Sequence, residues 1–186
     1  MIIDRRDALA GVVAMFGASL FAPIARAAAA QVTPISGGPP SSPVFTAQQR
    51  ALMTALSERV MPTTDTPGAI TAGVPAFIEK LLADWASPDD RKPILAGLDA
   101  IEARAQADYR VAGDKATPTQ QDALLTLAME DKLPGGKGFF EKFRQLVITG
   151  YFTSEVGITQ EREYLPVPGR YDGAYRYSQV NKVFSS

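Results

Sequence analysis

Residues 139–151 read FFEKFRQLVITGY, and this stretch decides the fold class of the chain. Its apolar residues recur at intervals of three and four, which is the spacing of one face of an α-helix. The side chains expected on the buried face are Phe139, Phe140, Phe143, Leu146, Val147 and Tyr151. Because no strand-like alternation of useful length occurs in the sequence, we expect an all-α protein.

Two further helices are expected between residues 46 and 86. Thr46 and Gln49 have the spacing of a capping box, in which each side chain satisfies a free backbone donor at the start of a helix. Pro62 ends this first helix, and the turn-forming residues 63–68 follow it. Pro75 suits the first turn of a second helix, whose apolar face includes Phe77, Ile78, Leu81, Leu82 and Trp85.

Two more helices, together with the one at residues 139–151, complete the expected domain. Ser87 starts a helix with acidic residues in its first turn, and we expect Pro93 to restart or kink it before Tyr109. Thr117 starts the next helix, and a glycine turn at 135–136 precedes the last one. We therefore expect one irregular or orthogonal bundle of about five helices across residues 46–152.

The amino-terminal residues have the order of an export signal. Arg5 and Arg6 precede an apolar stretch at 8–22, and a run of alanines follows at 27–30. The apolar stretch is about 15 residues long, whereas about 20 are needed to span a bilayer. The arginine pair favours the twin-arginine route for folded proteins, with the ordinary unfolded route as the alternative. We expect residues 1–27 to be the signal peptide and residues 28–45 to be a flexible tether rich in proline and glycine.

The residue types that the chain lacks exclude several functions. It contains no cysteine and no histidine, so it has neither a disulfide nor the usual ligands of iron–sulfur clusters, haem or zinc. The net charge is −1, and no basic stripe points to a nucleic-acid partner. We therefore expect a chain poorly suited to hold a cofactor to use a route favoured by cofactor proteins. The simplest interpretation is a small subunit that travels with a larger partner.

Residues 153–186 are expected to form an extended, irregular arm. Prolines and glycines interrupt the segment after residue 150, while tyrosines and an arginine remain. Aromatic residues and arginine are enriched at interface hot spots. The alternative is a tail that packs on its own bundle, with tyrosines filling gaps. Residue chemistry alone leaves both interpretations open.

Four local patterns could suggest catalysis or ligand binding, and each has a simpler explanation. Glu161 and Glu163 could act as an acid–base pair but lie in an exposed polar run. Asp65 lacks the alternating acids of a calcium loop. Ser154 has no base to activate it. Residues 135–138 lack the spacing of a phosphate-binding loop and are expected to form a turn.

The chain resembles the small subunit, often called subunit 3, of membrane-bound gluconate 2-dehydrogenase. Four blocks carry the resemblance, at residues 60–69, 73–78, 150–157 and 166–173. The last two blocks are the more specific. The resemblance spans about residues 46–173, and the extension at 174–186 is longer than the usual family ending.

This resemblance implies a non-catalytic partner of a large flavoprotein of the glucose–methanol–choline class. The large subunit would carry FAD and oxidise a sugar, glycoside or sugar acid, and electrons would pass to quinones or to a cytochrome c with haem c. The small subunit would lend its export signal to a complex in the periplasm, where it could lie at the face of the inner membrane. The candidate interface residues are Tyr151, Phe152, Glu155, Tyr164, Arg170, Tyr171 and Asp172. A free-standing periplasmic ligand-binding protein is the alternative.

Overall fold

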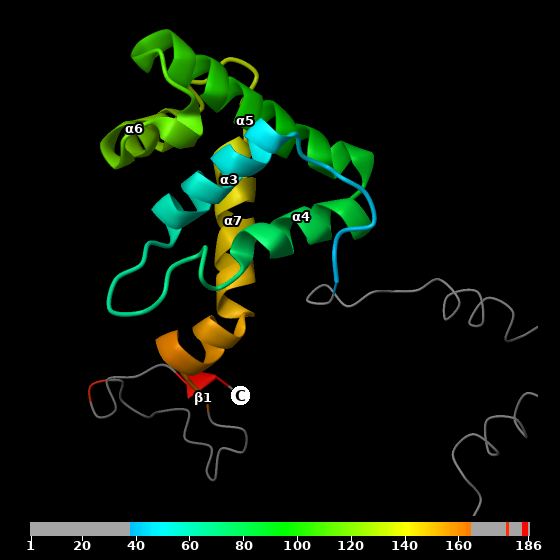
Figure 1. Ribbon diagram of the computed structural model, residues 1–186, viewed down its shortest axis with the longest axis vertical. Helices are drawn as coiled ribbons and strands as arrows, with labels where there is room; N and C mark the ends of the chain where they lie inside the picture. The colour runs from blue at the N-terminus through cyan, green and yellow to red at the C-terminus, as the bar shows by residue number, and fades with distance from the viewer. Residues whose placement is uncertain (1–37, 165–177, 179–183, 186) are drawn as a thin grey trace, which may run out of the picture. The chain divides into compact units, whose positions relative to one another are not determined.

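The computed structural model describes residues 38–164, 178 and 184–185 (Figure 1). The chain divides into two units, Met1–Gly38 and Pro39–Ser186, and the described helices belong to the second. These are α3 (Ala47–Val60), α4 (Val74–Asp84), α5 (Pro88–Tyr109), α6 (Pro118–Met129) and α7 (Phe139–Phe152). A short 3₁₀ turn, η1 (Gly113–Lys115), lies between α5 and α6. The expected all-α bundle is confirmed.

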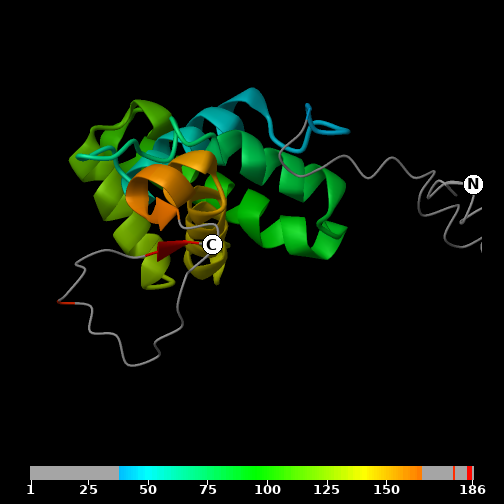
Figure 2. The ribbon, with the colours of Figure 1, turned by 90° about the horizontal axis from the view of Figure 1, so that it is seen from below.

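Helix α7 is the central element of this bundle. It contacts α3, α4, α5 and α6, and Figure 2 views it nearly along its axis. Phe139 and Phe143 are fully buried on it, and their rings stack with centroids 5.2 Å apart. Val147 and Tyr151 continue the same buried face at intervals of four residues. The periodicity of residues 139–151 therefore correctly identified the core-facing side of this helix.

The predicted capping signals start helices at the expected places. The Thr46 hydroxyl accepts a hydrogen bond from the Gln49 backbone N–H (3.1 Å), and the Gln49 side chain accepts one from the Thr46 N–H (3.0 Å). Thr117 and Gln120 form the same reciprocal pair at α6. Such caps stabilise a helix by about 1 kcal/mol, because they satisfy donors that no helical carbonyl can reach.

Helix α5 continues through Pro93, where the sequence predicts a restart or a kink. Proline lacks the N–H that would bond to the carbonyl four residues earlier, which is that of Asp89. Asp89 lies in the exposed first turn, where water can hydrate its carbonyl. The position of the proline near the helix start explains why the helix is not divided.

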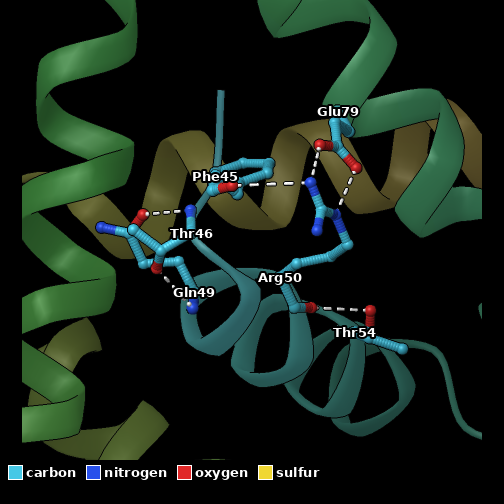
Figure 3. Close-up of polar contacts among 6 residues, drawn as sticks. All are labelled: Phe45, Thr46, Gln49, Arg50, Thr54 and Glu79. Carbon is cyan, nitrogen blue, oxygen red and sulfur yellow. Dashed lines mark hydrogen bonds and ion pairs between the residues drawn. The ribbon is translucent and has the colours of Figure 1, made fainter. Parts of the chain in front are cut away.

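An ion pair joins the start of α3 to α4 (Figure 3). The Arg50 guanidinium donates from Nε to one oxygen of Glu79 (2.8 Å) and from Nη2 to the other (2.6 Å). Nη2 also donates to the Phe45 carbonyl, at 3.5 Å. The planar, two-point contact links the first turn of α3 to α4 in addition to their apolar packing.

The last part of the predicted tether is attached to α4. The buried Lys80 ammonium donates to the Pro39 carbonyl (3.0 Å) and to Asp84 (3.0 Å), and Asp84 accepts from the Ser41 N–H (2.9 Å). Phe45 is buried in the core. Residues 39–45 are thus held by specific contacts, whereas the sequence predicts a flexible segment up to residue 45. The predicted limits of the signal peptide lie outside the described residues.

The described residues after α7 are partly helical. A π-helical turn, η2 (Gly157–Glu161), precedes the short strand β1 (Glu163–Tyr164), which pairs in parallel with β2 (Phe184–Ser185). The chain is therefore less extended between 157 and 161 than the sequence predicts. At the start of this turn, the Gly157 N–H donates a hydrogen bond to the Ser154 hydroxyl (3.1 Å).

Candidate partner-binding surface

Tyr151 is a core residue of the bundle. Its side chain is 2% exposed, and its hydroxyl donates to the Pro67 carbonyl at 2.8 Å. A phenol that is buried with its one donor satisfied stabilises the fold and is not available to a partner. For this candidate interface residue, the structure supports the alternative in which the tyrosine packs within its own bundle.

Phe152 and Glu155 lie nearer the surface. The half-buried Phe152 ring meets the Tyr151 ring edge-on, with centroids 5.3 Å apart. The Arg162 guanidinium lies 4.6 Å from the Phe152 ring centroid, at cation–π distance. Glu155 is exposed. These contacts hold Arg162 against α7 and leave Glu155 accessible to a partner.

The remaining candidates cannot be placed as side chains. The Tyr164 backbone forms part of β1, opposite Ser185. Arg170, Tyr171 and Asp172 lie outside the described residues, as do Arg5 and Arg6. Their proposed roles stay predictions from the sequence.

Glu58 organises the loop between α3 and α4, a role that the sequence analysis missed. One carboxylate oxygen accepts from the Thr63 N–H (2.9 Å) and hydroxyl (2.6 Å), and the other accepts from the Ile70 N–H (3.0 Å). Gly68 packs so closely beneath it that a Cβ there would collide with the Glu58 carboxylate. The only feature of the sequence that pointed to this loop structure was Gly68, at the end of the polar run 63–67.

Hydrogen bonding controls the ionisation of Glu58. Partial burial raises the pKa of Glu58, but bonds from the Thr63 hydroxyl and from the Ile70 and Thr63 N–H groups outweigh it. The pKa of Glu58 consequently lies below its ordinary value. A second contact supports the same loop, because the Thr66 hydroxyl donates to Glu161 at 2.7 Å. The loop is therefore tied both to α3 and to η2.

The residues weighed for catalysis have structural partners. The Ser154 hydroxyl donates to the Tyr151 carbonyl at 2.6 Å, and Asp65 accepts from the Thr64 hydroxyl. Gly135 and Gly138 have positive φ angles of 80° and 70°, as expected for a turn. Within the described part of the chain, no cluster of three or more acidic side chains has the arrangement of a metal site.

An open apolar groove lies where α4, α5 and α7 meet. Its volume is about 650 Å³. Its apolar wall is formed by Leu81, Leu82, Trp85, Ala86, Ile94 and Leu146. Polar residues of α5 and α7 complete it, namely Asp90, Glu141, Lys142 and Gln145. We name this feature the Trp85 groove, because the Trp85 side chain is 54% exposed on its wall.

The corner that carries Trp85 is held by hydrogen bonds to its backbone. The Arg91 guanidinium donates to the Ala83 carbonyl (3.0 Å) and to the Ala86 carbonyl (2.9 and 3.1 Å). The Ala83 carbonyl belongs to the last turn of α4, where no helical N–H can satisfy it, and the Ala86 carbonyl lies in the turn between α4 and α5. Ser87 then caps α5 by accepting from the Asp90 N–H at 3.2 Å. The indole therefore projects from a fixed backbone.

Charge around the groove is partly balanced. The Ser87 hydroxyl, opposed by burial, lowers the pKa of Asp90, and Lys142 acts in the same direction as the hydroxyl. Glu141 accepts from the Arg144 guanidinium at 2.7 Å. The three charged residues that line the groove, Asp90, Glu141 and Lys142, have a formal sum of −1. The groove thus combines an apolar wall with an edge on which both acids have a nearby cation, Lys142 for Asp90 and Arg144 for Glu141.

A second hollow, of about 310 Å³, lies between α3, α6 and α7. Met129 is 55% exposed there, beside a two-point ion pair between Arg59 and Asp122. The apolar Met129 side chain is as exposed as that of Trp85, but it lies on α6, away from the Trp85 groove. This makes Met129 a suitable reference for the Trp85 groove.

The fold and the groove define the class of the protein as a helical domain with an open apolar groove on its surface. The sequence model of the family described as gluconate 2-dehydrogenase subunit 3 matches residues 47–169, and the chain belongs to this family. Comparison with curated proteins and with solved structures gave no significant match. Membership indicates an accessory subunit of a gluconate 2-dehydrogenase type of complex.

The family match includes the Glu58 loop and the whole Trp85 groove. It ends at residue 169, so Arg170, Tyr171 and Asp172 lie just beyond it. The resemblance recognised in the sequence is therefore confirmed, although its predicted end at residue 173 is not reached. None of the helices in the described part is long and apolar enough to cross a bilayer.

Proposed function

We propose that this chain is the non-catalytic small subunit of a periplasmic, flavin-dependent sugar, glycoside or sugar-acid dehydrogenase. It binds a large flavoprotein of the glucose–methanol–choline class, which carries FAD and performs the oxidation. A cytochrome c subunit or quinones accept the electrons. The observation that carries the proposal is the family match over residues 47–169.

Composition supports a role without a redox centre of its own. The chain contains no histidine and no cysteine, which are the residues that most often ligate haem, iron–sulfur clusters and zinc. The bundle also has surface features suited to a partner, because an apolar groove lies open on it. These features support binding of another subunit as the chain's own contribution.

Export is the second part of the proposed role. The Arg5–Arg6 pair and the apolar stretch at 8–22 are typical of a signal for the folded route. A flavoprotein without a signal of its own would cross the membrane with this subunit. The complex would then lie in the periplasm, at the face of the inner membrane where its electron acceptors are.

Co-purification tests the proposal directly. We expect a tagged full chain, co-expressed with the flavoprotein encoded nearest to it, to purify with that protein and a stoichiometric flavin absorbance. The full chain expressed alone should be colourless and inactive on sugars with an artificial electron acceptor. A flavin band or activity in the chain alone would contradict the proposal, as would a flavoprotein that never associates with it.

The volume of the Trp85 groove favours one alternative function. Pockets for small molecules commonly measure about 300–1,000 Å³, and the groove falls in this range. A free-standing ligand-binding protein would therefore use the same groove. Association with a flavoprotein distinguishes the two functions, because only the subunit requires it.

A further inference from the structure

We propose that residues 39–45 form a strap that Lys80 and Asp84 hold against α4, and that this attachment protects the junction between the bundle and the predicted export signal from proteolysis. We name this segment the N-terminal strap. Figure 1 shows it as the blue segment that leads into α3. The strap belongs to the bundle itself, so this role does not depend on a flavoprotein partner.

Hydrogen bonds from one turn of α4 attach the strap. The Lys80 ammonium donates to the Pro39 carbonyl (3.0 Å), and the Asp84 carboxylate accepts from the Ser41 N–H (2.9 Å). Lys80 and Asp84 also form an ion pair with each other, at 3.0 Å. Because residues four apart meet on one face of a helix, these two side chains come together only when α4 is folded. The strap is therefore held in the folded chain and released in the unfolded one.

The ion pair that holds the strap is buried. The side chains of Lys80 and Asp84 are 4% and 10% exposed, and a lysine is seldom buried this deeply unless it is paired. Hydrogen bonds from the Ser41 hydroxyl and N–H, together with the Lys80 ammonium, lower the pKa of Asp84 to about 2, against the effect of burial. Asp84 therefore stays ionised near neutral pH, where it can accept both contacts.

The other end of the strap belongs to the hydrophobic core. Phe45 is 4% exposed, and the partly buried Val44 packs against the core beside it. The Arg50 guanidinium also donates to the Phe45 carbonyl, at 3.5 Å. Three of the seven strap residues are prolines, which restrict the free segment and so reduce the entropy that is lost when it is fixed. The strap is thus held at both ends.

The attachment matters because most of the strap lies on the surface. Pro39 and residues 41–43 are exposed, and cleavage concentrates in exposed segments of small and polar residues near chain ends. A held segment must open locally before a protease can cut it, so the rate follows the fraction of chains in which it is open. The contacts with α4 lower that fraction. We therefore expect the folded protein to resist cleavage from residue 39 onward, and not only from the start of α3.

Limited proteolysis of the purified full chain tests this role. Thermolysin cuts before bulky apolar residues, so its sites in the strap are Val44 and Phe45, and mass spectrometry identifies the fragments. Asp84→Ala removes the acceptor of the Ser41 N–H and the partner of Lys80. It should raise the rate of cleavage at the two strap sites about tenfold or more, because the open form becomes more populated.

The matched control is Asp108→Ala. Asp108 pairs with Arg104 at 2.6 Å and with the same spacing of four residues, but both residues lie on α5. This pair is more exposed than the one on α4, and exposed pairs contribute little to stability. The control should therefore change the rate of cleavage in the strap less than about twofold.

Lys80→Met tests the attachment without leaving a buried cation unpaired. It removes the donor to the Pro39 carbonyl, while the apolar methionine side chain can occupy a similar space. Cleavage at the strap sites should again be about tenfold faster or more, whereas sites within α3 to α7 should stay as resistant as in the wild type. If Asp84→Ala unfolds the bundle, thermolysin will cut throughout the chain, and Lys80→Met then decides the result.

Hydrogen exchange shows whether the whole strap is released or only its end. The Ser41 amide should exchange about tenfold more slowly or more in the wild type than in Asp84→Ala. If this amide exchanges faster in both variants but the cleavage at Val44 and Phe45 is unchanged, the core contacts alone hold the segment and the proposed role is wrong. Equal cleavage rates in Asp84→Ala and Asp108→Ala would overturn it as well. These measurements use the chain without its partner, so their failure would leave the proposed function standing.

Discussion

At the scale of single residues, Glu58 shows how one carboxylate can fix a loop without secondary structure. Its two oxygens accept from Thr63 and Ile70, which lie at opposite ends of the segment. The Tyr151 hydroxyl binds the Pro67 carbonyl from the other side. The loop conformation therefore depends on side chains of three elements, Glu58 of α3, Tyr151 of α7 and Glu161 of η2.

The substitution Glu58→Gln should destabilise the bundle. The amide can accept at one position only, so one of the loop's N–H groups would lose its partner. We expect a loss of about 1–2 kcal/mol, which corresponds to a melting temperature roughly 3–6 °C lower. Asp65→Asn is the control in the same loop, because Asp65 accepts only from the Thr64 hydroxyl. Calorimetry of the full chain measures both, and equal melting temperatures of the two variants would contradict the role of Glu58.

The same substitution has a defined pH dependence. The pKa of Glu58 is lower in the folded chain than its ordinary value, so the unfolded chain binds more protons between the two values. The stabilisation is fully present above about pH 4.3 and is lost as the pH falls through the folded value. The difference in melting temperature between wild type and Glu58→Gln should therefore shrink below about pH 4. A constant difference down to pH 3 would exclude this linkage.

The aromatic residues show what could be predicted at this scale. Tyr151 fits the helical spacing of a core residue in α7, and as a tyrosine it also fits an interface. Only its burial in the structure shows that it is a core residue. Trp85 continues the apolar spacing of α4 but is exposed, because it is the C-terminal cap of that helix, where the chain turns toward α5. Periodicity predicts which face of a helix is apolar. It does not predict whether another helix covers the end of that face.

At the scale of elements, the contact between α5 and α7 depends on a glycine within a helix. A Cβ at Gly97 would collide with the Phe139 ring, which packs directly against the α5 backbone. Glycine normally weakens a helix by up to about 1 kcal/mol relative to alanine. Here close packing of the first turn of α7 compensates for that cost.

We expect Gly97→Ala to destabilise the bundle by about 1–3 kcal/mol, although alanine is the better helix former. The reason is overpacking against Phe139, which lies in a filled core and cannot move freely. In the double variant Gly97→Ala, Phe139→Leu the smaller side chain should relieve the clash. The double variant should then lose less stability than the sum of the single changes, as measured by urea unfolding. Strict additivity would show that the glycine is not needed for this contact.

The number and order of helices could be predicted because their boundaries are encoded locally. The capping boxes at Thr46 and Thr117 specify where α3 and α6 start, because the side chains of neighbouring residues satisfy the free backbone donors there. Pro93 was misleading, since its effect depends on how far it lies from the helix start. The attachment of residues 39–45 to α4 could not be predicted, because the Lys80–Asp84 network joins residues about 40 positions apart. The groove likewise exists only where three helices meet.

At the scale of the whole molecule, the proposed complex separates catalysis from export. The described bundle contains side chains that pack and pair, and the chain as a whole lacks the common redox ligands. A flavoprotein must fold around its cofactor where the cofactor is made, so its export benefits from a folded route. A subunit that binds the finished flavoprotein and carries the signal would couple assembly to export.

Changing Arg5 and Arg6 together to lysine tests this coupling in cells. Lysine keeps the positive charge but not the planar guanidinium, so recognition that requires the arginine pair should fail. We expect both this chain and the flavoprotein to accumulate in the cytoplasm, with dehydrogenase activity moving from the periplasmic to the cytoplasmic fraction. Arg26→Lys is the control, because it alters an arginine of the same segment outside the pair. Co-purification from the cytoplasm would show that the mutant still assembles and fails only in transport. Undiminished periplasmic activity in the double mutant would instead mean that the pair is not read as a twin-arginine signal, and the chain would then use the unfolded route without carrying a folded partner.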